Sequence, residues 1–341
     1  MKSKRILYFD LLNIISCIAV IFLHHNVVVH VYEQNPVWAQ ALVIEVICYW
    51  AVPVFLMLSG ANLLNYREKY DTKIFLEKRV QRAVIPFLFW SVVYTSLVTY
   101  WGWYDAKSAG IRGVLNDIMN CRIESIYWFF PTIFSIYALM PVLSKLTKGK
   151  DQSILWYIVG VLFVFSSLIP PLCSMVGIEW NTSIGMPINS LVLYVILGYL
   201  LANTEISREK RIALYILGLM AAVFRYGAVF KLSIVKGTKD ELFFNYSYFP
   251  AVFLSVAVFL AFKYIDWSSL KPCANCIAAI SNCSLGIYLL HKLVMPWEQK
   301  WLHLDNFSLK WRLLCPFVTY FVSLLIIAGI KKIPVLKKIV P

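Results

Sequence analysis

The segment MKSKRILYFDLLNIISCIAVIFLHHNVVV, residues 1–29, decides the class of fold. Basic residues precede an apolar run that is longer than the hydrophobic region of a typical signal peptide. Asp10 and Asn13 lie within this run, and no small-x-small cleavage site follows it. We therefore predict that the segment is retained as a first membrane-spanning helix.

The composition of the chain extends this prediction. Of the 341 residues, 60% are hydrophobic and 15% are charged, whereas soluble domains average about 45–50% and about 25%. The 22 Phe, 20 Tyr and 12 Trp residues exclude a disordered chain. The net charge of +14 is typical of basic residues that flank membrane spans, so we expect no nucleic-acid partner.

Nine further apolar windows predict nine more helices. A stretch of about 18 mostly apolar residues is long enough to cross a bilayer. The windows lie near residues 39–63, 84–103, 126–144, 153–171, 188–203, 212–224, 247–262, 275–291 and 314–330. We predict an all-α, polytopic membrane protein of about ten transmembrane helices, forming a single domain over residues 1–341.

The basic residues predict the orientation of these helices. If both termini are cytoplasmic, the inner segments hold about two thirds of the 32 Lys and Arg residues. Membrane proteins concentrate Lys and Arg in cytoplasmic loops.

The eight cysteines show no disulfide framework, and the single CxxC pair at Cys273 and Cys276 lacks the second pair that a zinc site requires. We expect no metal.

The first helix carries a polar stripe. Eleven steps of about 100° bring His24 within about 20° of Asn13, and Asp10 lies within about 40° of His24. With a rise of about 1.5 Å per residue, Asn13 lies near the cytoplasmic edge of the bilayer and His24 near its outer face. Ionisable residues inside a membrane face a cavity or each other by default.

Two other titratable side chains are expected at the depth of His24. The predicted topology brings Glu45 of the second helix and His291 of the ninth helix to the outer edge. A neutral imidazole there is able to take a proton from a hydroxyl, particularly when a carboxylate orients its other nitrogen. We therefore predict His24, Glu45 and His291 as catalytic residues. The alternative is that these histidines and His25 are wet interfacial residues, and that Glu45 pairs with a base of an outer loop.

A second constellation precedes the third predicted span. Arg79 and Arg82, followed by Pro86, place two guanidiniums on one face near a helix N-terminus, as a receptor for phosphates. Lys73 and Lys78 add charge nearby. The alternative is that these residues serve the positive-inside bias and bind anionic lipid.

Two softer signals concern small and aromatic residues. Ser59 and Gly60, at the end of the second span, allow close approach between helices. The run from Trp128 to Phe130 lies at the outer end of the fourth span, where an aromatic belt is expected.

Five segments, in their order and spacing, resemble the acyltransferase-3 family. They are FDLLNIISCIAVIFLHHN (9–26), VPVFLMLSGANLL (52–64), FLEKRVQRAVIPFLFW (75–90), YWFFPTIFSIYALMP (127–141) and SLGIYLLHKLV (284–294). The likeness covers nearly the whole chain. Members of that family transfer acyl groups, often acetyl from acyl-coenzyme A, to sugars of surface polysaccharides, lipopolysaccharide, peptidoglycan or glycolipids. The resemblance implies a membrane O-acetyltransferase in the plasma membrane of a bacterium.

The resemblance also assigns roles to residues. His24 matches the essential histidine of the family's first helix, and Arg79 and Arg82 match a basic pair implicated with the acyl-CoA donor. Ser59 and Gly60 match a serine-glycine step.

One position departs from the family pattern. The family has an arginine ten residues before the histidine, and this chain has Asn13 there. Asparagine hydrogen-bonds but does not neutralise a phosphate. Either Arg79, Arg82 or the neighbouring lysines supply the charge, or the donor is handled differently, or the transferase activity has been lost.

These residues predict a path for the donor. Acyl-CoA is expected as a substrate rather than as a bound cofactor, with its phosphates at the basic inner rim and its pantetheine arm along the stripe. The expected donor-binding residues are Asp10, Asn13, Ser59, Arg79 and Arg82. His24 then acts as a general base or as a transient acyl carrier.

The expected acceptor is a carbohydrate at the outer face. Aromatic side chains of the outer loops are candidates for stacking on its rings, or equally members of an interfacial belt: Trp101, Trp103, Trp180, Trp297 and Trp301. Membrane lipids are the other expected partners. The alternative function is export of a polysaccharide or lipid-linked sugar without covalent chemistry.

Overall fold

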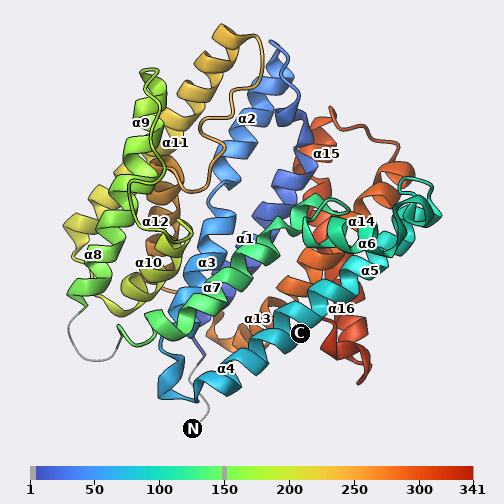
Figure 1. Ribbon diagram of the computed structural model, residues 1–341, viewed down its shortest axis with the longest axis horizontal. Helices are drawn as coiled ribbons and strands as arrows, with labels where there is room; N and C mark the ends of the chain where they lie inside the picture. The colour runs from blue at the N-terminus through green and yellow to red at the C-terminus, as the bar shows by residue number, and fades with distance from the viewer. Residues whose placement is uncertain (1–4, 148–151, 341) are drawn as a thin grey trace.

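The chain folds into helices joined by loops of varied length (Figure 1). The computed structural model describes residues 5–147 and 152–340, and no residue in these ranges lies in a β-strand. The α-helices are α1 (Leu7–His25), α2 (Pro36–Cys48), α3 (Ala51–Leu63), α4 (Thr72–Arg79), α5 (Ile85–Tyr100), α6 (Ala106–Met119), α7 (Phe129–Leu143), α8 (Ser153–Leu162), α9 (Ile169–Met175), α10 (Val192–Asn203), α11 (Arg208–Lys236), α12 (Phe249–Tyr264), α13 (Ala274–Ser281), α14 (Ser284–Leu302), α15 (Leu309–Leu313) and α16 (Cys315–Lys331). Shorter 3₁₀ and π segments are η1 (Val27–His30), η2 (Tyr66–Glu68), η3 (Val80–Val84), η4 (Ser125–Trp128), η5 (Phe163–Leu168), η6 (Ser268–Cys273) and η7 (Leu336–Lys338).

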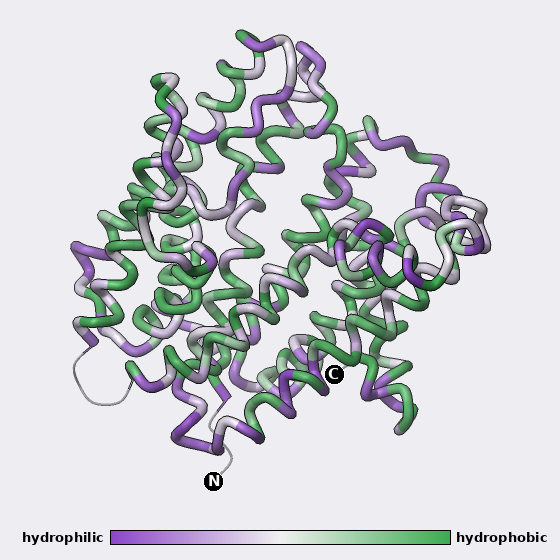
Figure 2. The backbone as a smooth tube through the Cα atoms, viewed as in Figure 1, coloured by the Kyte–Doolittle hydropathy of each residue, from purple (hydrophilic) through white to green (hydrophobic). Residues whose placement is uncertain are grey.

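Helix α1 is the common neighbour of elements from both halves of the chain. It packs against α2 and α3 from the first half, and against α12, α13, α14 and α16 from the second. Figure 2 shows apolar positions along most of the helices, with polar positions concentrated in the connections. A polar residue on the inward face of α1 is therefore held among other helices.

Six helical segments of the described ranges are long and apolar enough to cross a membrane. A seventh forms if α12 and the segment Ser268–Ser281, which meet at a bend of 85°, are taken as one broken span. The six are Leu7–His25, Pro36–Glu68, Thr72–Tyr100, Ser125–Leu143, Ser153–Met175 and Arg208–Lys236. This number is typical of a multi-pass membrane protein.

Each of the ten predicted apolar windows overlaps a helix, and the windows 39–63 and 275–291 are each divided between two helices. Fewer than ten helices meet the requirements for a span. Helices α10 and α16 are too short, and α14 carries Lys292, Glu298 and Lys300. In α10 every residue from 192 to 201 is buried, so this helix is an internal element enclosed by protein. Ten spans with both termini in the cytoplasm therefore stay a prediction.

Helix α11 corrects the shortest predicted window. The sequence predicted a helix near residues 212–224, whereas α11 has 29 residues and runs on to the left-handed cap at Gly237. The window ended early because Arg225 interrupts the apolar run. In the fold Arg225 is only 1% exposed and is paired within the protein, so its charge does not end the helix.

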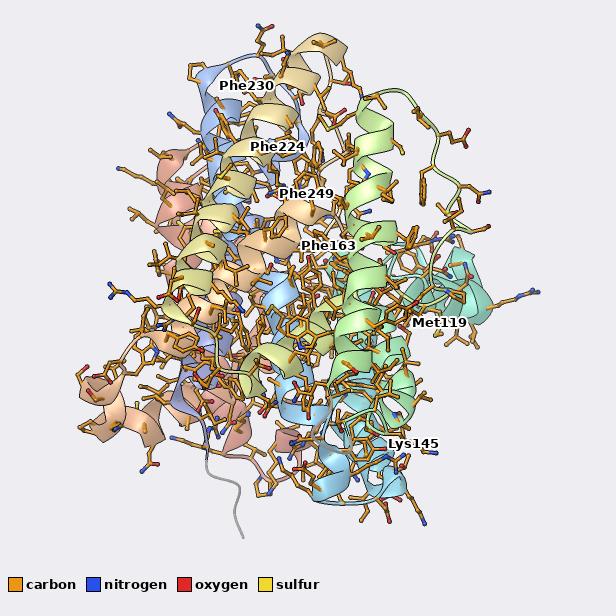
Figure 3. All side chains as sticks on the ribbon, turned by 90° about the vertical axis from the view of Figure 1, so that its left-hand side faces the viewer. Met119, Lys145, Phe163, Phe224, Phe230 and Phe249 are labelled. Carbon is orange, nitrogen blue, oxygen red and sulfur yellow. The ribbon has the colours of Figure 1, made fainter. Side chains whose placement is uncertain are left out.

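Aromatic packing joins α12 to both α11 and η5. Phe224 lies 5.3 Å from Phe249 between ring centroids, and Phe163 lies 5.4 Å from Phe253. Figure 3 shows Phe163, Phe249, Phe224 and Phe230 following one another along this side of the molecule. These ring contacts hold the buried face of the long helix against its neighbours.

Two glycines bring α3 and α10 into backbone contact. A Cβ atom on Gly60 would lie 1.8 Å from the carbonyl oxygen of Val195, and one on Gly198 would lie 2.0 Å from that of Met57. The expectation that Gly60 permits close helix packing is confirmed. This contact holds the α3 face that carries Ser59 in a fixed position.

The close contact predicts that Gly60→Ala destabilises the protein. The added methyl group has no space unless α10 shifts, and overpacking of this kind costs about 1–3 kcal/mol or more. Gly227→Ala on α11 is the matched control, because nothing lies within 4 Å of a Cβ there. Thermal unfolding of the detergent-solubilised protein should show a lower midpoint for Gly60→Ala only. Equal midpoints for the two variants would contradict this account of α3 and α10.

Candidate active site

A cavity of about 1400 Å³ follows one face of α1. Asp10, Asn13 and His24 all line it, as the predicted stripe requires. Fourteen residues separate the first of these from the last, so the cavity extends along about 21 Å of the helix. Exposed residues line it at both ends, with Lys69 and Arg82 at one and Trp128 and Glu241 at the other.

Polar contacts fix α1 against α13 and α14. The side-chain amide of Asn13 donates to the carbonyl and hydroxyl oxygens of Ser281, at 2.8 and 2.9 Å. The Cys17 thiol lies 3.7 Å from the carbonyl oxygen of Ser284. Helix α13 ends at Ser281, so carbonyl oxygens there have no partner within the helix and accept bonds from neighbouring side chains.

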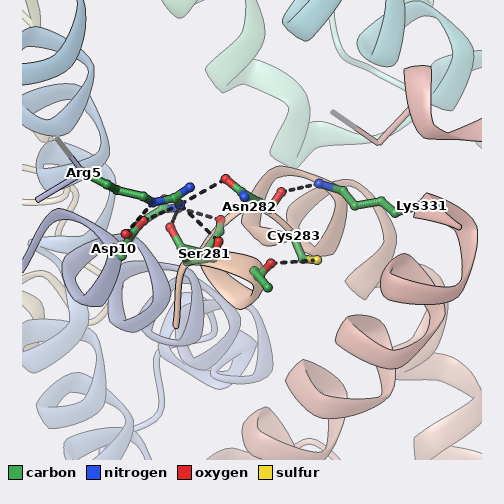
Figure 4. A network of polar contacts seen from close by, with 9 residues as sticks. Arg5, Asp10, Ser281, Asn282, Cys283 and Lys331 are labelled. Carbon is green, nitrogen blue, oxygen red and sulfur yellow. Dashed lines mark hydrogen bonds and ion pairs between the residues drawn. The ribbon is translucent and has the colours of Figure 1, made fainter. Parts of the chain in front are cut away.

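The inner end of this contact is a charged network (Figure 4). The Arg5 guanidinium forms two bonds of 2.6 Å with the Asp10 carboxylate, and also donates to the side chain of Asn282 at 3.1 Å. Lys331, at the end of α16, donates to the backbone carbonyl of Asn282 at 2.6 Å. Arg5 and Lys331 therefore converge on Asn282, which brings together segments close to the two ends of the chain.

His24 and His291 contact each other directly. Nδ1 of His24 lies 2.7 Å from Nε2 of His291, and His291 is completely buried. Nδ1 of His291 lies 2.7 Å from the carbonyl oxygen of Tyr288. Because a carbonyl oxygen only accepts, Nδ1 of His291 carries the hydrogen and donates it.

When both rings are neutral, this bond fixes the hydrogen positions in the pair. Nε2 of His291 then has a lone pair and accepts from Nδ1–H of His24. Nε2 of His24 is consequently unprotonated, and no described residue hydrogen-bonds to it. His24 thus presents a basic nitrogen on a ring that lines the cavity. His291 does not line the cavity and acts on it only through His24.

Burial separates two of these histidines from the wet residues of the alternative interpretation, whereas His24 lines the cavity. His291 and His25 are fully buried, and His24 is half-buried. His25 faces away from the pair, where Nε2 lies 2.8 Å from the Thr319 hydroxyl.

Glu45 also lines the cavity, but its ion pair is with Arg225 of α11. The two side chains are 3.9 Å apart, and the Arg225 guanidinium lies 3.4 Å from the centre of the Tyr49 ring. Arg225 also donates to the carbonyl oxygen of Phe243 at 2.8 Å. Within the described chain no hydrogen bond joins the Glu45 carboxylate to His24. The ion pair that the alternative interpretation expected for Glu45 is therefore present, and its base lies in α11 because this helix extends beyond the predicted window.

Arg79 and Arg82 line the same cavity, but their place in the helix was predicted wrongly. They lie inside a continuous helical segment, Thr72–Tyr100, and not near its start. Asp71 caps that segment by accepting from the backbone N–H of Ile74 at 2.8 Å, so the helix begins about three turns before the predicted window. Arg79 is the last residue of α4, and Arg82 lies in the π-helical stretch η3 that joins α4 to α5.

The two guanidiniums have no ion-pair partner among the described residues. The Arg79 guanidinium lies about midway between two aromatic rings, 5.5 Å from Phe75 and 5.4 Å from Tyr137, and its Nε atom has no hydrogen-bond partner. Of the two lysines expected nearby, Lys78 lies over the Tyr70 ring at 3.8 Å. Neither Lys73 nor Lys78 is among the residues that line the cavity.

Ser59 lines the same cavity, and its hydroxyl donates to the Phe55 carbonyl oxygen within α3 at 3.0 Å. All five predicted donor-binding residues therefore face one space. Their functional roles stay predictions.

The outer end contains residues that the sequence analysis missed. Nζ of Lys239 lies 2.8 Å from Nδ1 of His30 and 2.7 Å from the Glu241 carboxylate, and all three side chains line the cavity. Partial burial, and then the Lys239 ammonium, lower the pKa of His30. The ring therefore accepts from Lys239 in its neutral form. The sequence did contain one signal for this end of the site. Arg225 is a charged residue within the apolar sequence of α11, and such residues face a cavity or a partner.

None of the five tryptophans proposed for sugar stacking lines the cavity. The described residues contain no group of three or more His, Cys, Asp or Glu side chains placed to hold a metal ion.

Comparison with known proteins identifies a family. The sequence profile of the acyltransferase-3 family, described as an acyltransferase domain, matches residues 6–331. No curated protein and no solved structure matches the chain.

Proposed function

Because this chain belongs to the acyltransferase-3 family, we propose that it moves an acetyl group from acetyl-CoA to a hydroxyl group of a saccharide at the surface of a bacterial cell. The observation that carries the proposal is one continuous cavity, with guanidiniums that have no described ion-pair partner at one end and the basic nitrogen of His24 toward the other. We place the arginine end at the cytoplasm, where acetyl-CoA is made.

The inner end suits an anionic donor. Arg79 and Arg82 have no carboxylate partner among the described residues, so their charges are available for the phosphates of coenzyme A. Arg5 contributes a third guanidinium but shares its charge with Asp10. In this proposal these arginines supply the charge that Asn13 lacks, and Asn13 holds α13 in place through Ser281.

The first version of the chemistry uses His24 as a general base. Nε2 takes the proton from the acceptor hydroxyl, and the oxygen attacks the thioester carbonyl carbon. The C–S bond then breaks, and the thiolate of coenzyme A takes the proton from His24. His291 holds the ring in the required tautomer and stabilises the imidazolium that forms, as the orienting carboxylate does in a serine protease.

The second version uses His24 as an acyl carrier. Nε2 attacks the thioester carbonyl carbon, the C–S bond breaks, and coenzyme A leaves as its thiolate. The acceptor oxygen then attacks the acetyl carbonyl carbon, the C–N bond to the imidazole breaks, and the proton of the hydroxyl passes to the thiolate. Both versions require the same free lone pair on Nε2. They therefore make the same demand on His291.

His24→Ala tests the assignment of the reacting residue. We expect acetylation to fall by about 10³-fold, because the base or carrier is lost, while the amount of protein in the membrane is unchanged. Mass spectrometry of surface glycans should then find an intact glycan without its acetyl groups, as in cells that lack the protein. Full acetylation in the variant would remove His24 from the mechanism. Loss of the whole glycan would favour the exporter.

His291 is expected to act through the tautomer of His24. In His291→Gln the amide oxygen replaces the Nε2 acceptor, whereas His291→Phe removes it. We predict that His291→Phe lowers kcat by about 10²-fold or more with little change in KM for acetyl-CoA, and that the Gln variant retains most of the activity. A role in packing alone predicts the reverse order or equal loss in the two variants, together with less folded protein.

The donor end is tested by paired variants on one helical segment. Loss of a charge-assisted bond to phosphate costs about 1.5–3 kcal/mol, so Arg79→Ala and Arg82→Ala should each raise KM for acetyl-CoA by about 10-fold or more. Lys73→Ala is the control, because Lys73 is exposed and does not line the cavity. Steady-state kinetics with purified protein give both constants. An equal effect of all three variants would point to general surface charge instead of a donor site.

A further inference from the structure

The outer half of the cavity has a wall of stacked aromatic rings. The rings of Trp128 and Tyr246 are 5.7 Å apart with an angle of 18° between their planes, and those of Tyr246 and Tyr49 are 4.2 Å apart at 15°. All three line the cavity, and we call them the aromatic wall. Trp128 is 37% exposed and Tyr49 only 2%, so the wall leads from the surface into the protein.

The aromatic wall is assembled from distant parts of the sequence. Trp128 ends η4, Tyr246 lies in the segment between α11 and α12, and Tyr49 follows the last residue of α2. The sequence analysis took Trp128 as part of a lipid-facing belt. In the structure the Trp128 ring instead stacks on Tyr246 and lines the mouth of the cavity.

Charged side chains accompany the wall. Glu45, Glu241 and Lys239 line the same half of the cavity. Each carboxylate has a cation partner, Arg225 for Glu45 and Lys239 for Glu241, so the charges at this end balance. Flat apolar rings beside carboxylate oxygens suit a molecule with C–H groups on its face and hydroxyl groups at its edge. An alkyl chain would exclude solvent from these charged groups without offering them hydrogen bonds.

The aromatic wall is connected to the histidine pair. Successive ring contacts run from Trp128 to Phe129 at 6.3 Å, from Phe129 to Tyr288 at 6.2 Å, and from Tyr288 to His291 at 5.9 Å. Phe129 and Tyr288 also line the cavity. A molecule stacked on the wall therefore lies in the same space as His24.

We propose that the aromatic wall of Trp128, Tyr246 and Tyr49 is the acceptor subsite, and that it binds an uncharged pyranose ring with one hydroxyl group directed toward His24. The sugar ring stacks on Trp128 at the exposed end of the wall, because Tyr246 and Tyr49 already stack on each other and on Trp128 and Arg225. Its other hydroxyl groups donate to Glu45 and Glu241. The role of this surface as an acceptor site rests on the proposed function.

Glycoside binding tests the subsite without requiring catalysis. The full chain is placed in phospholipid nanodiscs, which avoids sugar-based detergents, and methyl glycosides of glucose, galactose and N-acetylglucosamine are the probes. Saturation-transfer NMR should detect binding of at least one of them to the wild-type protein. Trp128→Ala should weaken that binding by about 10-fold, and Trp128→Phe should retain most of it.

Trp103→Ala is the matched control. Trp103 is 69% exposed, contacts the ring of Trp101, and does not line the cavity. Its replacement should leave glycoside binding unchanged. Retained binding of acetyl-CoA by each variant shows that the protein is folded. Binding that is absent from the wild-type protein, or that is lost equally in Trp128→Ala and Trp103→Ala, would overturn the subsite.

Transfer assays on the same preparations separate the two proposals. If the wild-type protein acetylates a bound glycoside and Trp128→Ala raises KM for that glycoside, both proposals are supported. If it binds glycosides through Trp128 but transfers no acetyl group, the proposed function is overturned and the binding surface stands. If it acetylates a glycoside with the same KM in Trp128→Ala, the subsite is overturned and the function stands.

Discussion

The fold and the site depend on the pairing of α1 with α13 and α14. Asn13, Cys17 and His24 contact Ser281, Ser284 and His291 at an almost constant offset along the chain. The two segments therefore run side by side in the same direction and in register. A shift of one residue would turn each side chain by about 100° about the helix axis and would separate the imidazoles. The bonds from Asn13 near the inner end thus set the position of His24 near the outer end, and with it the tautomer that leaves Nε2 free.

The distribution of charge distinguishes the two ends of the cavity. Charged groups inside a membrane protein are costly unless they are paired. At the outer end the described carboxylates and cations pair with one another, with Glu45 on Arg225 as the buried example. At the inner end Arg79 and Arg82 line the space with no described ion-pair partner. The paired charges at the outer end are suited to an uncharged molecule, in keeping with a saccharide acceptor. The arginines at the inner end are suited to an anion, in keeping with a nucleotide-bearing donor.

Much of this arrangement was predictable from the sequence, and the failures have a common cause. Helical periodicity was enough to place Asp10, Asn13 and His24 on one face, and the apolar windows were enough to locate helices. The window predicted for α11 ended too early, at Arg225, because the charge of this residue is paired with Glu45, which is distant in the sequence. The start of α4 was missed because a single cap at Asp71 decides it. The aromatic wall was missed because its three rings come from separate parts of the chain, and sequence alone does not distinguish an aromatic facing a cavity from one facing lipid.

The most direct test of the account is transfer across a membrane by the purified protein. Proteoliposomes would hold isotopically labelled acetyl-CoA on the side of Arg79 and Arg82 and a methyl glycoside on the side of Trp128, with mass spectrometry of the glycoside after incubation. The account predicts that the label appears on the glycoside, although the two substrates were never on the same side. An unlabelled glycoside, whether it stays in place or crosses the membrane unchanged, would contradict the account, and crossing would favour export.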